Sequence, residues 1–325
     1  MSGDEKQKEL TRREALARGV TAVPLFAAAA RQATAADAKS HAVGPILGHV
    51  DHDTAILWYR PANPGEYVAT LTQAVTGETR SAKATASPDH DLCVTWRFNG
   101  LNAKTEYRYA ITRDGQAVSK GDAQRIRTAP PADESSRTVL AMGSCASSTK
   151  FFDVWTQIGS KNIDALMLLG DTPYIDNTKL SVNRSRHRDF LSIPTLAKLG
   201  ASTPVWGTWD DHDFGGNDTD GKIRNKSVLR QVFTEYRAQT EFGDGEHGIY
   251  TKFRRGPIEV FMIDPRYFSQ TEPSPVDAKK PTCLGKTQWQ WLRDGLKQST
   301  APFKMLATGM IWDDKKNGEK DDWGT

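Results

Sequence analysis

The sequence predicts an α/β domain preceded by an antiparallel β-sandwich, and three observations support this. Between about residues 43 and 128, alternating or β-branched runs are separated by Pro, Gly, Asn and Asp, which is typical of a sandwich. A polar, proline-rich stretch follows over 129–136. Beyond it, short apolar runs alternate with segments of helical periodicity, which indicates α/β architecture with at least partly parallel strands.

Length and composition narrow the functional classes. A chain of 325 residues is long enough for two domains with buried cores. With 43 Lys and Arg against 40 Asp and Glu, the net charge of +3 carries no nucleic-acid-binding signature. The three cysteines are an odd number at unrelated spacings, so no disulfide framework is readable. At least one thiol is left over and could serve as a ligand.

The first forty residues indicate an export signal. Arg12 and Arg13 precede a short apolar run over 19–30 and a small-residue cleavage pattern over 33–35. Twelve apolar residues are too few to span a bilayer, so we expect no transmembrane anchor. The paired arginines resemble a twin-arginine signal, which implies passage of the folded protein through export machinery. The alternatives are an ordinary secretory signal and an alanine-rich amphipathic helix.

Four strands are expected in the sandwich, over 54–59, 67–73, 92–98 and 106–112. The segment 101–109 resembles the turn and strand of fibronectin type III domains, with Tyr107 packed at a corner. Cys93, beside Val94 and Trp96, is expected to be a small buried residue. His41, His49, His52 and His90 are expected on the surface. None of these residues forms a catalytic pattern.

The α/β region contains five expected strands and three expected helices. The strands are predicted over 138–142, 165–169, 204–209, 258–263 and 305–311, and the helices over 152–158, 227–238 and 287–296. The chain is therefore divided into an export signal over 1–38, the sandwich over 39–131, a linker over 132–136 and the α/β domain over 137–325.

Chemically capable residues follow four of these strands. They are Cys145, Asp171 with Tyr174, the run Asp210-Asp211-His212-Asp213, and Asp264 with Arg266. In open α/β sheets the functional crevice lies beyond the carboxyl ends of the strands, so we expect these side chains to converge.

The richest of these segments lies over 207–218. Four acids lie around His212 there, at 210, 211, 213 and 218, with a fifth at 220 just beyond, directly after an apolar run. Carboxylates confined near a buried strand end repel one another unless cations compensate them, which favours a metal site. The alternative is a solvated acidic turn or a helix N-cap.

The order of these motifs resembles one known family. Gly143-Ser144-Cys145-Ala146, Gly170-Asp171-x-x-Tyr174, Trp209-Asp210-Asp211-His212-Asp213 with Asn217-Asp218, and Asp264-x-Arg266-Tyr267 are similar to the PhoD-like alkaline phosphatases of the metallophosphatase superfamily. The resemblance covers residue 43 to the last residue and agrees with the sandwich and the signal. It implies an α+β four-layer metallophosphatase-like sandwich, here incomplete, that hydrolyses phosphate mono- or diesters.

The resemblance also implies a two-metal site. In such sites two ions clamp the phosphoryl group, and one activates water as a hydroxide nucleophile. Asp171 takes the bridging position. Cys145 and Tyr174 favour a strongly Lewis-acidic ion, consistent with Fe(3+), and Ca(2+) is implied beside it. Asp211 corresponds to a ligand of the second metal, and Asp210 either ligates calcium or caps the turn.

Further residues are candidates beside the metals. His212 could donate a proton to the leaving alkoxide or stabilise it, with Asp213 orienting the imidazole or lying outside the ligand shell. Arg266 could grip a phosphate bidentately or pair with Asp264. The basic cluster Arg184, Arg186, His187 and Arg188 either attracts anionic substrate or is a solvated helix face.

The resemblance breaks off at the end of the chain. Members of the family continue to a strand with a Gly-Asp-x-His segment, whereas this sequence stops at Thr325. We therefore expect a fragment of a longer enzyme or a truncated product with little activity. The predicted protein is a monomeric, periplasmic or extracellular, metal-dependent phosphatase or phosphodiesterase. The alternatives are a non-catalytic exported binding protein and a metal-dependent esterase on the same scaffold.

Overall fold

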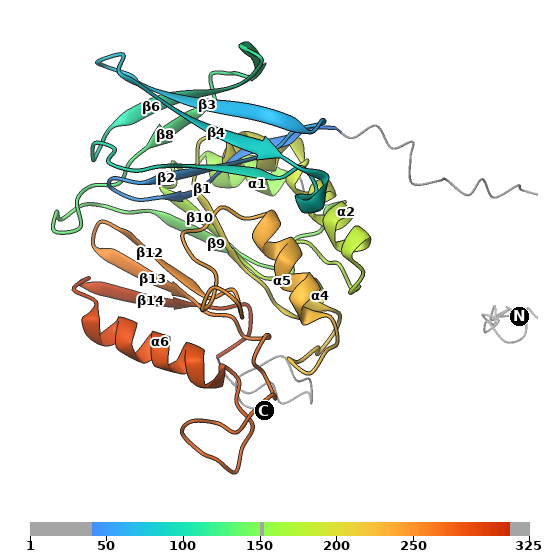
Figure 1. The fold of residues 1–325 in the computed structure, drawn as a ribbon. Helices are drawn as coiled ribbons and strands as arrows, with labels where there is room; N and C mark the ends of the chain where they lie inside the picture. The colour runs from blue at the N-terminus through green and yellow to red at the C-terminus, as the bar shows by residue number, and fades with distance from the viewer. Residues whose placement is uncertain (1–40, 150–152, 313–325) are drawn as a thin grey trace, which may run out of the picture. The chain divides into compact units, whose positions relative to one another are not determined.

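Two antiparallel sheets form the N-terminal sandwich of the computed structural model, which describes residues 41–149 and 153–312 (Figure 1). The predicted export signal lies outside the described residues. One sheet has the order β1 (Val43–Val50), β2 (Ala55–Arg60), β5 (Val94–Phe98). The other has the order β4 (Thr79–Ala86), β3 (Gly65–Gln73), β6 (Glu106–Arg113), β7 (Gln116–Ser119), with β8 (Arg125–Arg127) also paired to β6. A 3₁₀ turn, η2 (Pro88–His90), precedes β5.

The predicted antiparallel sandwich is confirmed, and its residues alternate as expected. In β5, Val94, Trp96 and Phe98 are buried and the residues between them are exposed. Tyr107 is buried, and its hydroxyl accepts a hydrogen bond from the backbone N–H of Asn102 at 2.8 Å. The corner position predicted for Tyr107 is thus correct, whereas a specific fibronectin type III kinship stays a prediction.

Two three-stranded sheets build the α/β region. The first is parallel, with the order β11 (Val205–Thr208), β10 (Ala165–Leu169), β9 (Leu140–Gly143). The second has β13 (Ile258–Met262) in the centre, antiparallel to β12 (Thr251–Arg255) and parallel to β14 (Phe303–Ala307). Apolar side chains of both sheets share one core, in which the rings of Trp206 and Phe253 stack at 3.8 Å.

The helices are α1 (Asp153–Gly159), α2 (Leu180–Leu191), α3 (Pro194–Gly200), α4 (Asp211–Phe214), α5 (Lys226–Glu235) and α6 (Gly285–Gln298). Residues of α1, α2, α3 and α5 share a core with β1, β2 and the parallel sheet. Helix α6 packs on the opposite side, against Phe261 and Ile263 of the second sheet and its continuation (Figure 1). The result is a mixed α/β arrangement with several sheets. In the described part of the chain, no helix has the length and apolarity needed to cross a membrane.

Several predicted elements need correction. The last strand ends at Ala307 rather than at 311, because the chain turns there toward Asp210. The described part of the sandwich has eight strands where four were expected, because β1, β4, β7 and β8 were missed. Strand β12 and helix α3 were not predicted either, since both are short and carry mixed polar and apolar residues. The predicted domain boundaries stay predictions.

The interpretation of the basic cluster as a solvated helix face is wrong for most of its members. On α2, Arg184 donates two hydrogen bonds to the Glu235 carboxylate, at 2.8 and 2.6 Å. Arg188 pairs with Asp91 at 2.5 Å, and the buried His187 stacks on a tyrosine ring. Arg186 is exposed. The acids come from the sandwich and from α5, so local sequence could not indicate these pairs.

Candidate metal centre

The carboxyl ends of the parallel strands bring the predicted site residues to one edge of the sheet. Leu168 lies opposite Gly143 and Leu169 lies opposite Thr208, so the three strands end at nearly the same level. A candidate ligand follows each strand within three residues: Cys145 after β9, Asp171 after β10, and Asp211 after β11. The predicted convergence of these residues is therefore seen.

Asp171 lies at the centre of this cluster. One ligand atom from each of Asp171, Asp211 and His212 falls within 4.8 Å of the others, and both carboxylates are buried. The Cys145 thiol lies 3.6 Å from Oδ2 of Asp171. Among the described residues, Oδ1 of Asp171 has no hydrogen-bond partner although it is buried. Burial and the charge of Asp211 together raise the pKa of the Asp171 carboxyl.

The backbone around this cluster is tightly packed. Gly170 has a φ of +97°, and a Cβ atom there would lie 2.6 Å from the Cβ of Asp210. Asp171 and Cys145 also have positive φ, at 52° and 57°, which is uncommon for side chains of this kind. Gly309, which sequence reasoning missed, is equally close, since a Cβ there would meet the Leu169 carbonyl at 2.5 Å. A glycine inside the strand expected over 305–311 was the available signal.

His212 is held between two side chains. Its Nδ1 lies 2.5 Å from Oδ1 of Asp176, and its ring lies 4.6 Å from the Tyr174 ring, centroid to centroid. Burial acts to lower the pKa of His212, but the hydrogen bond to Asp176 and the charges of Asp211 and Asp171 outweigh it and raise the pKa. Burial raises the pKa of Tyr174, and its hydrogen bonds to Cys145 and Asp171 add to this. Asp176 carried no motif that could have indicated its role.

Arg266 lies behind the cluster in an ion pair with Asp210. Its Nε and Nη2 lie 2.6 and 2.5 Å from Oδ1 of Asp210, and the Arg266 side chain is only 3% exposed. Burial raises the pKa of Asp210 to about 7 even though Arg266 acts to lower it. Asp264 accepts hydrogen bonds from the backbone N–H groups of Arg266 and Tyr267 instead of pairing with the guanidinium.

The remaining acids of this segment bond to the backbone. Asp213 is buried and accepts from the N–H of Asp210 at 2.5 Å and of Thr172 at 3.4 Å. Burial raises the pKa of Asp213 well above its usual range. The N–H of Asp218 donates to Asp211 at 2.7 Å, within a turn that follows α4. The imidazole of His212 is thus oriented by Asp176, while Asp213 fixes the start of α4.

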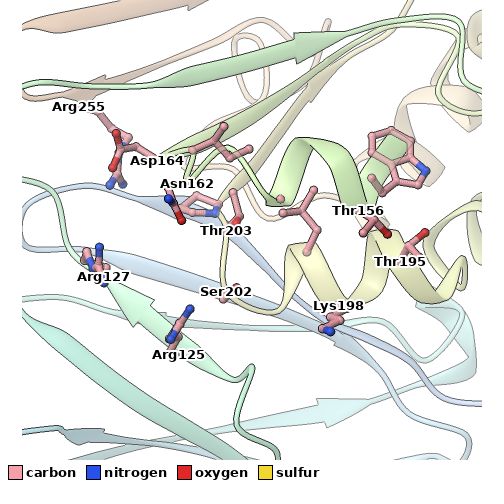
Figure 2. Close-up of a pocket in the computed structure, with 15 residues that line it drawn as sticks. Arg125, Arg127, Thr156, Asn162, Asp164, Thr195, Lys198, Ser202, Thr203 and Arg255 are labelled. Atoms are coloured by element: carbon pink, nitrogen blue, oxygen red, sulfur yellow. The ribbon is translucent and has the colours of Figure 1, made fainter. Parts of the chain in front are cut away.

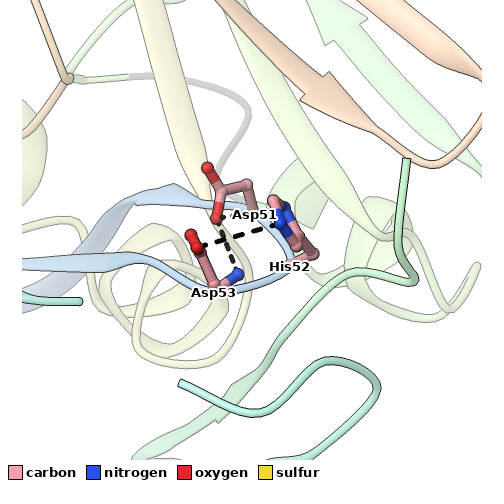
Figure 3. A group of neighbouring side chains, drawn as sticks. All are labelled: Asp51, His52 and Asp53. Atoms are coloured by element: carbon pink, nitrogen blue, oxygen red, sulfur yellow. Dashed lines mark hydrogen bonds and ion pairs between the residues drawn. The ribbon is translucent and has the colours of Figure 1, made fainter. Parts of the chain in front are cut away.

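A second acid and histidine cluster lies in the turn between β1 and β2, with Asp51, His52 and Asp53 (Figure 3). Asp51 accepts from the N–H groups of Asp53 and Thr54, at 2.9 and 2.7 Å. Its other oxygen lies 2.9 Å from Nε2 of His49. These bonds account for the geometry as a hydrogen-bonded turn. His49 is buried, with its ring edge-on to Trp206 at 5.7 Å between centroids, so its predicted surface position was wrong.

Comparison with known proteins identifies relatives along most of the chain. Residues 140–323, more than half of the chain, match a family model described as PhoD-like phosphatase. Alkaline phosphatase D of Bacillus subtilis (strain 168) is 24% identical over 322 residues, covering 82% of this chain and 55% of that protein. The chain thus spans about half the length of this curated relative.

Two solved structures share the fold. The structure of PhoD has a TM-score of 0.72 at 20% identity, covering 86% of this chain and 65% of that one. Purple acid phosphatase PPD1 from yellow lupin (Lupinus luteus) seeds has a TM-score of 0.59 at 11% identity, covering 82% and 50%.

Proposed function

The chain belongs to the PhoD-like phosphatase family, and on that premise we propose that it hydrolyses phosphate mono- or diesters in a metal-dependent reaction. One observation carries the proposal. The Asp171 carboxylate is buried, one of its oxygens has no hydrogen-bond partner among the described residues, and it lies with Asp211, His212 and Cys145 at the ends of three strands.

The residues present fit metal ions. A buried carboxylate oxygen without a donor is unfavourable, and a cation beside it removes this penalty. We propose that Asp171 would contribute to holding both ions, Cys145 and Tyr174 would hold one of them, and Asp211 would hold the other. Thiolate and phenolate oxygen suit a Lewis-acidic Fe(3+), whereas carboxylates suit Ca(2+). Asp210, paired with Arg266, would complete the ligands of the second ion, the one that Asp211 holds.

The chain's own side chains would bind the substrate and deliver a proton. When bound, the ions would neutralise phosphoryl charge and lower the pKa of the attacking water. Because Nδ1 of His212 is held by Asp176 at 2.5 Å, Nε2 is the nitrogen left to face a ligand. We propose that Nε2 donates a proton to the leaving oxygen. Arg266 is buried and engaged, so we propose that it acts by positioning Asp210 rather than by gripping phosphate.

Hydrolysis of para-nitrophenyl phosphate and of its bis ester tests the proposal. We expect turnover by the purified protein that a chelator abolishes and that Fe(3+) with Ca(2+) restores. Asp171→Asn should lower kcat/KM by more than about 100-fold, since even partners of metal ligands cost 10–100-fold. The matched control is Asp294→Asn on α6, whose side chain is 43% exposed.

Two outcomes would contradict the proposal. Turnover that is insensitive to the chelator would exclude a metal-dependent reaction. Absence of turnover on both esters, with metals supplied, would favour the non-catalytic binding protein instead.

The identity of the metals is tested separately. Elemental analysis should find iron and calcium, and a ferric ion bound by Tyr174 or Cys145 should give a visible charge-transfer band. Tyr174→Phe combined with Cys145→Ser should remove the band, whereas Cys93→Ser in the sandwich should leave it unchanged. An iron-free protein that is fully active would refute the ferric assignment.

We also propose export of the folded protein, which the paired arginines Arg12 and Arg13 support. Changing both to lysine should retain the protein in the cytoplasm of the producing cell. Unchanged export of this variant would contradict a twin-arginine signal.

A further inference from the structure

A hollow lies away from the candidate metal centre, between β8 of the sandwich and helices α1 and α3 (Figure 2). Its volume is about 440 Å³. Asp164, directly before β10, and Pro204, directly before β11, both line it. It therefore opens at the amino ends of the strands whose carboxyl ends carry Asp171 and Asp211. Five strand residues separate the two levels by roughly 17 Å, and none of the proposed metal ligands lines this hollow.

The lining carries an excess of positive charge. Arg125 and Arg127 come from β8, Lys198 from α3 and Arg255 from the end of β12. Figure 2 shows these four cationic side chains around the hollow. Among the described lining residues, Asp164 is the one acid, and its Oδ2 already accepts from the backbone N–H of Val139 at 2.7 Å. Cations gathered in this way attract an anion.

Arg255 is the buried member of this cationic group. It is only 4% exposed, and its Nη1 donates to the carbonyl oxygen of Val50 at 2.9 Å. Burial lowers the pKa of Arg255, and the charge of Arg127 lowers it further, while Asp164 and Asp51 raise it. The carbonyl takes one of the five N–H donors of the guanidinium. A buried guanidinium of this kind gains from an anionic partner.

The rest of the lining suits a small organic molecule. Trp155, Leu199 and Pro204 supply apolar surface, and Ser202 and Thr203 supply hydroxyl groups. Sites for small molecules usually have volumes of about 300–1,000 Å³ and use polar groups to fix the orientation of the ligand. We propose that this hollow binds a small organic phosphate, with the phosphate group among the four cations and the organic part against Trp155. This proposal does not depend on the hydrolytic function.

Calorimetric titration of the full chain with phenylphosphonate tests the site, because its phosphorus–carbon bond is not a phosphate ester. We expect saturable one-site binding that persists in a chelator. Arg125→Gln combined with Lys198→Gln should raise the Kd for phenylphosphonate about five- to tenfold. Each exposed charge contact changes an equilibrium constant by up to roughly fivefold. Both side chains belong to exposed residues, so the variant should fold. Lys297→Gln on α6 and Asp211→Asn in the candidate metal centre should leave the affinity unchanged.

The contrary outcomes are distinct. The proposal is overturned if phenylphosphonate does not bind, or if Asp211→Asn abolishes binding while the double variant does not. Equal binding of neutral benzyl alcohol would also overturn it, because the cations would then have no role. Tighter binding of a single-stranded oligonucleotide than of phenylphosphonate would assign the surface to a polyanion instead. If circular dichroism shows that the double variant is unfolded, Lys198→Glu alone is measured, with the same expectation.

Discussion

Removing the guanidinium of Arg266 is expected to destabilise the protein strongly. In Arg266→Met, the Asp210 carboxylate loses the guanidinium, whose Nη2 lies 2.5 Å from Oδ1 of Asp210. The Arg266 side chain is 3% exposed, so this ion pair is buried. Asp210 is then left in a buried position with the charges of Asp211 and Asp171 nearby. Above about pH 7, where Asp210 is ionised, breaking this buried ion pair by removing one partner costs about 3–5 kcal/mol. At about 2–4 °C per kcal/mol, this lowers the Tm by about 6–20 °C.

The measurement is chemical or thermal unfolding of the chelator-treated protein, since a bound cation would partly replace the guanidinium. Adding Asp210→Asn to Arg266→Met should recover much of the loss, because the uncompensated charge is then gone. Arg293→Met on α6 is the control. Its side chain is 49% exposed and 3.6 Å from Asp294, so the change should stay within about 0.5 kcal/mol.

A loss of less than about 1 kcal/mol in Arg266→Met would refute the reasoning, given the usual cost of a broken buried pair. So would a double variant no more stable than the single one. Either result would mean that Asp210 is neutral or well solvated in the folded protein. The proposed positioning role of Arg266 would then have no physical basis.

Three further predictions concern stability. Burial, assisted by the charge of Arg237, holds the pKa of His187 well below its usual 6.5. Below about pH 6.5 the unfolded chain therefore binds a proton that the folded protein does not bind. The free energy of unfolding then falls as the pH falls, by up to about 1.4 kcal/mol per pH unit. Urea unfolding between pH 7 and 5 should therefore show a shallower loss for His187→Phe, and equal slopes would contradict this. Gly309→Ala should cost about 1–3 kcal/mol and reduce the hydrolysis of para-nitrophenyl phosphate, because its Cβ would meet the Leu169 carbonyl at 2.5 Å. Gly121→Ala, with nothing within 4 Å, should be nearly neutral. Tyr107→Phe should cost about 1 kcal/mol by removing the acceptor at the corner, and an unchanged midpoint would show that the bond is not stabilising.

Much of the sandwich and of the parallel sheet could be predicted because their signals are local. Alternation in β5 and the apolar runs of β10 and β11 follow from which faces are buried. The convergence of Cys145, Asp171 and Asp211 followed from a general rule about strand ends. These inferences needed only neighbours along the chain and the geometry of a parallel sheet.

Pairings between distant segments were not predictable in the same way. The sequence indicated that Arg266 and Asp210 both follow strands, but only the tertiary structure placed the guanidinium on Asp210 and not on Asp264. The same holds for Asp176 beside His212, since a carboxylate in a loop carries no mark of its partner. Which side chains meet depends on how two sheets and their loops pack.

By itself the sequence determined the kinds of residue available for chemistry and the strand ends that present them, because composition and periodicity are properties of the chain. The tertiary structure decided which acid lacks a partner, which arginine is buried in an ion pair, and that Arg125, Lys198 and Arg255 surround a common hollow. Burial and proximity arise only when segments far apart in the sequence are packed together, and these two quantities set the electrostatics of both sites.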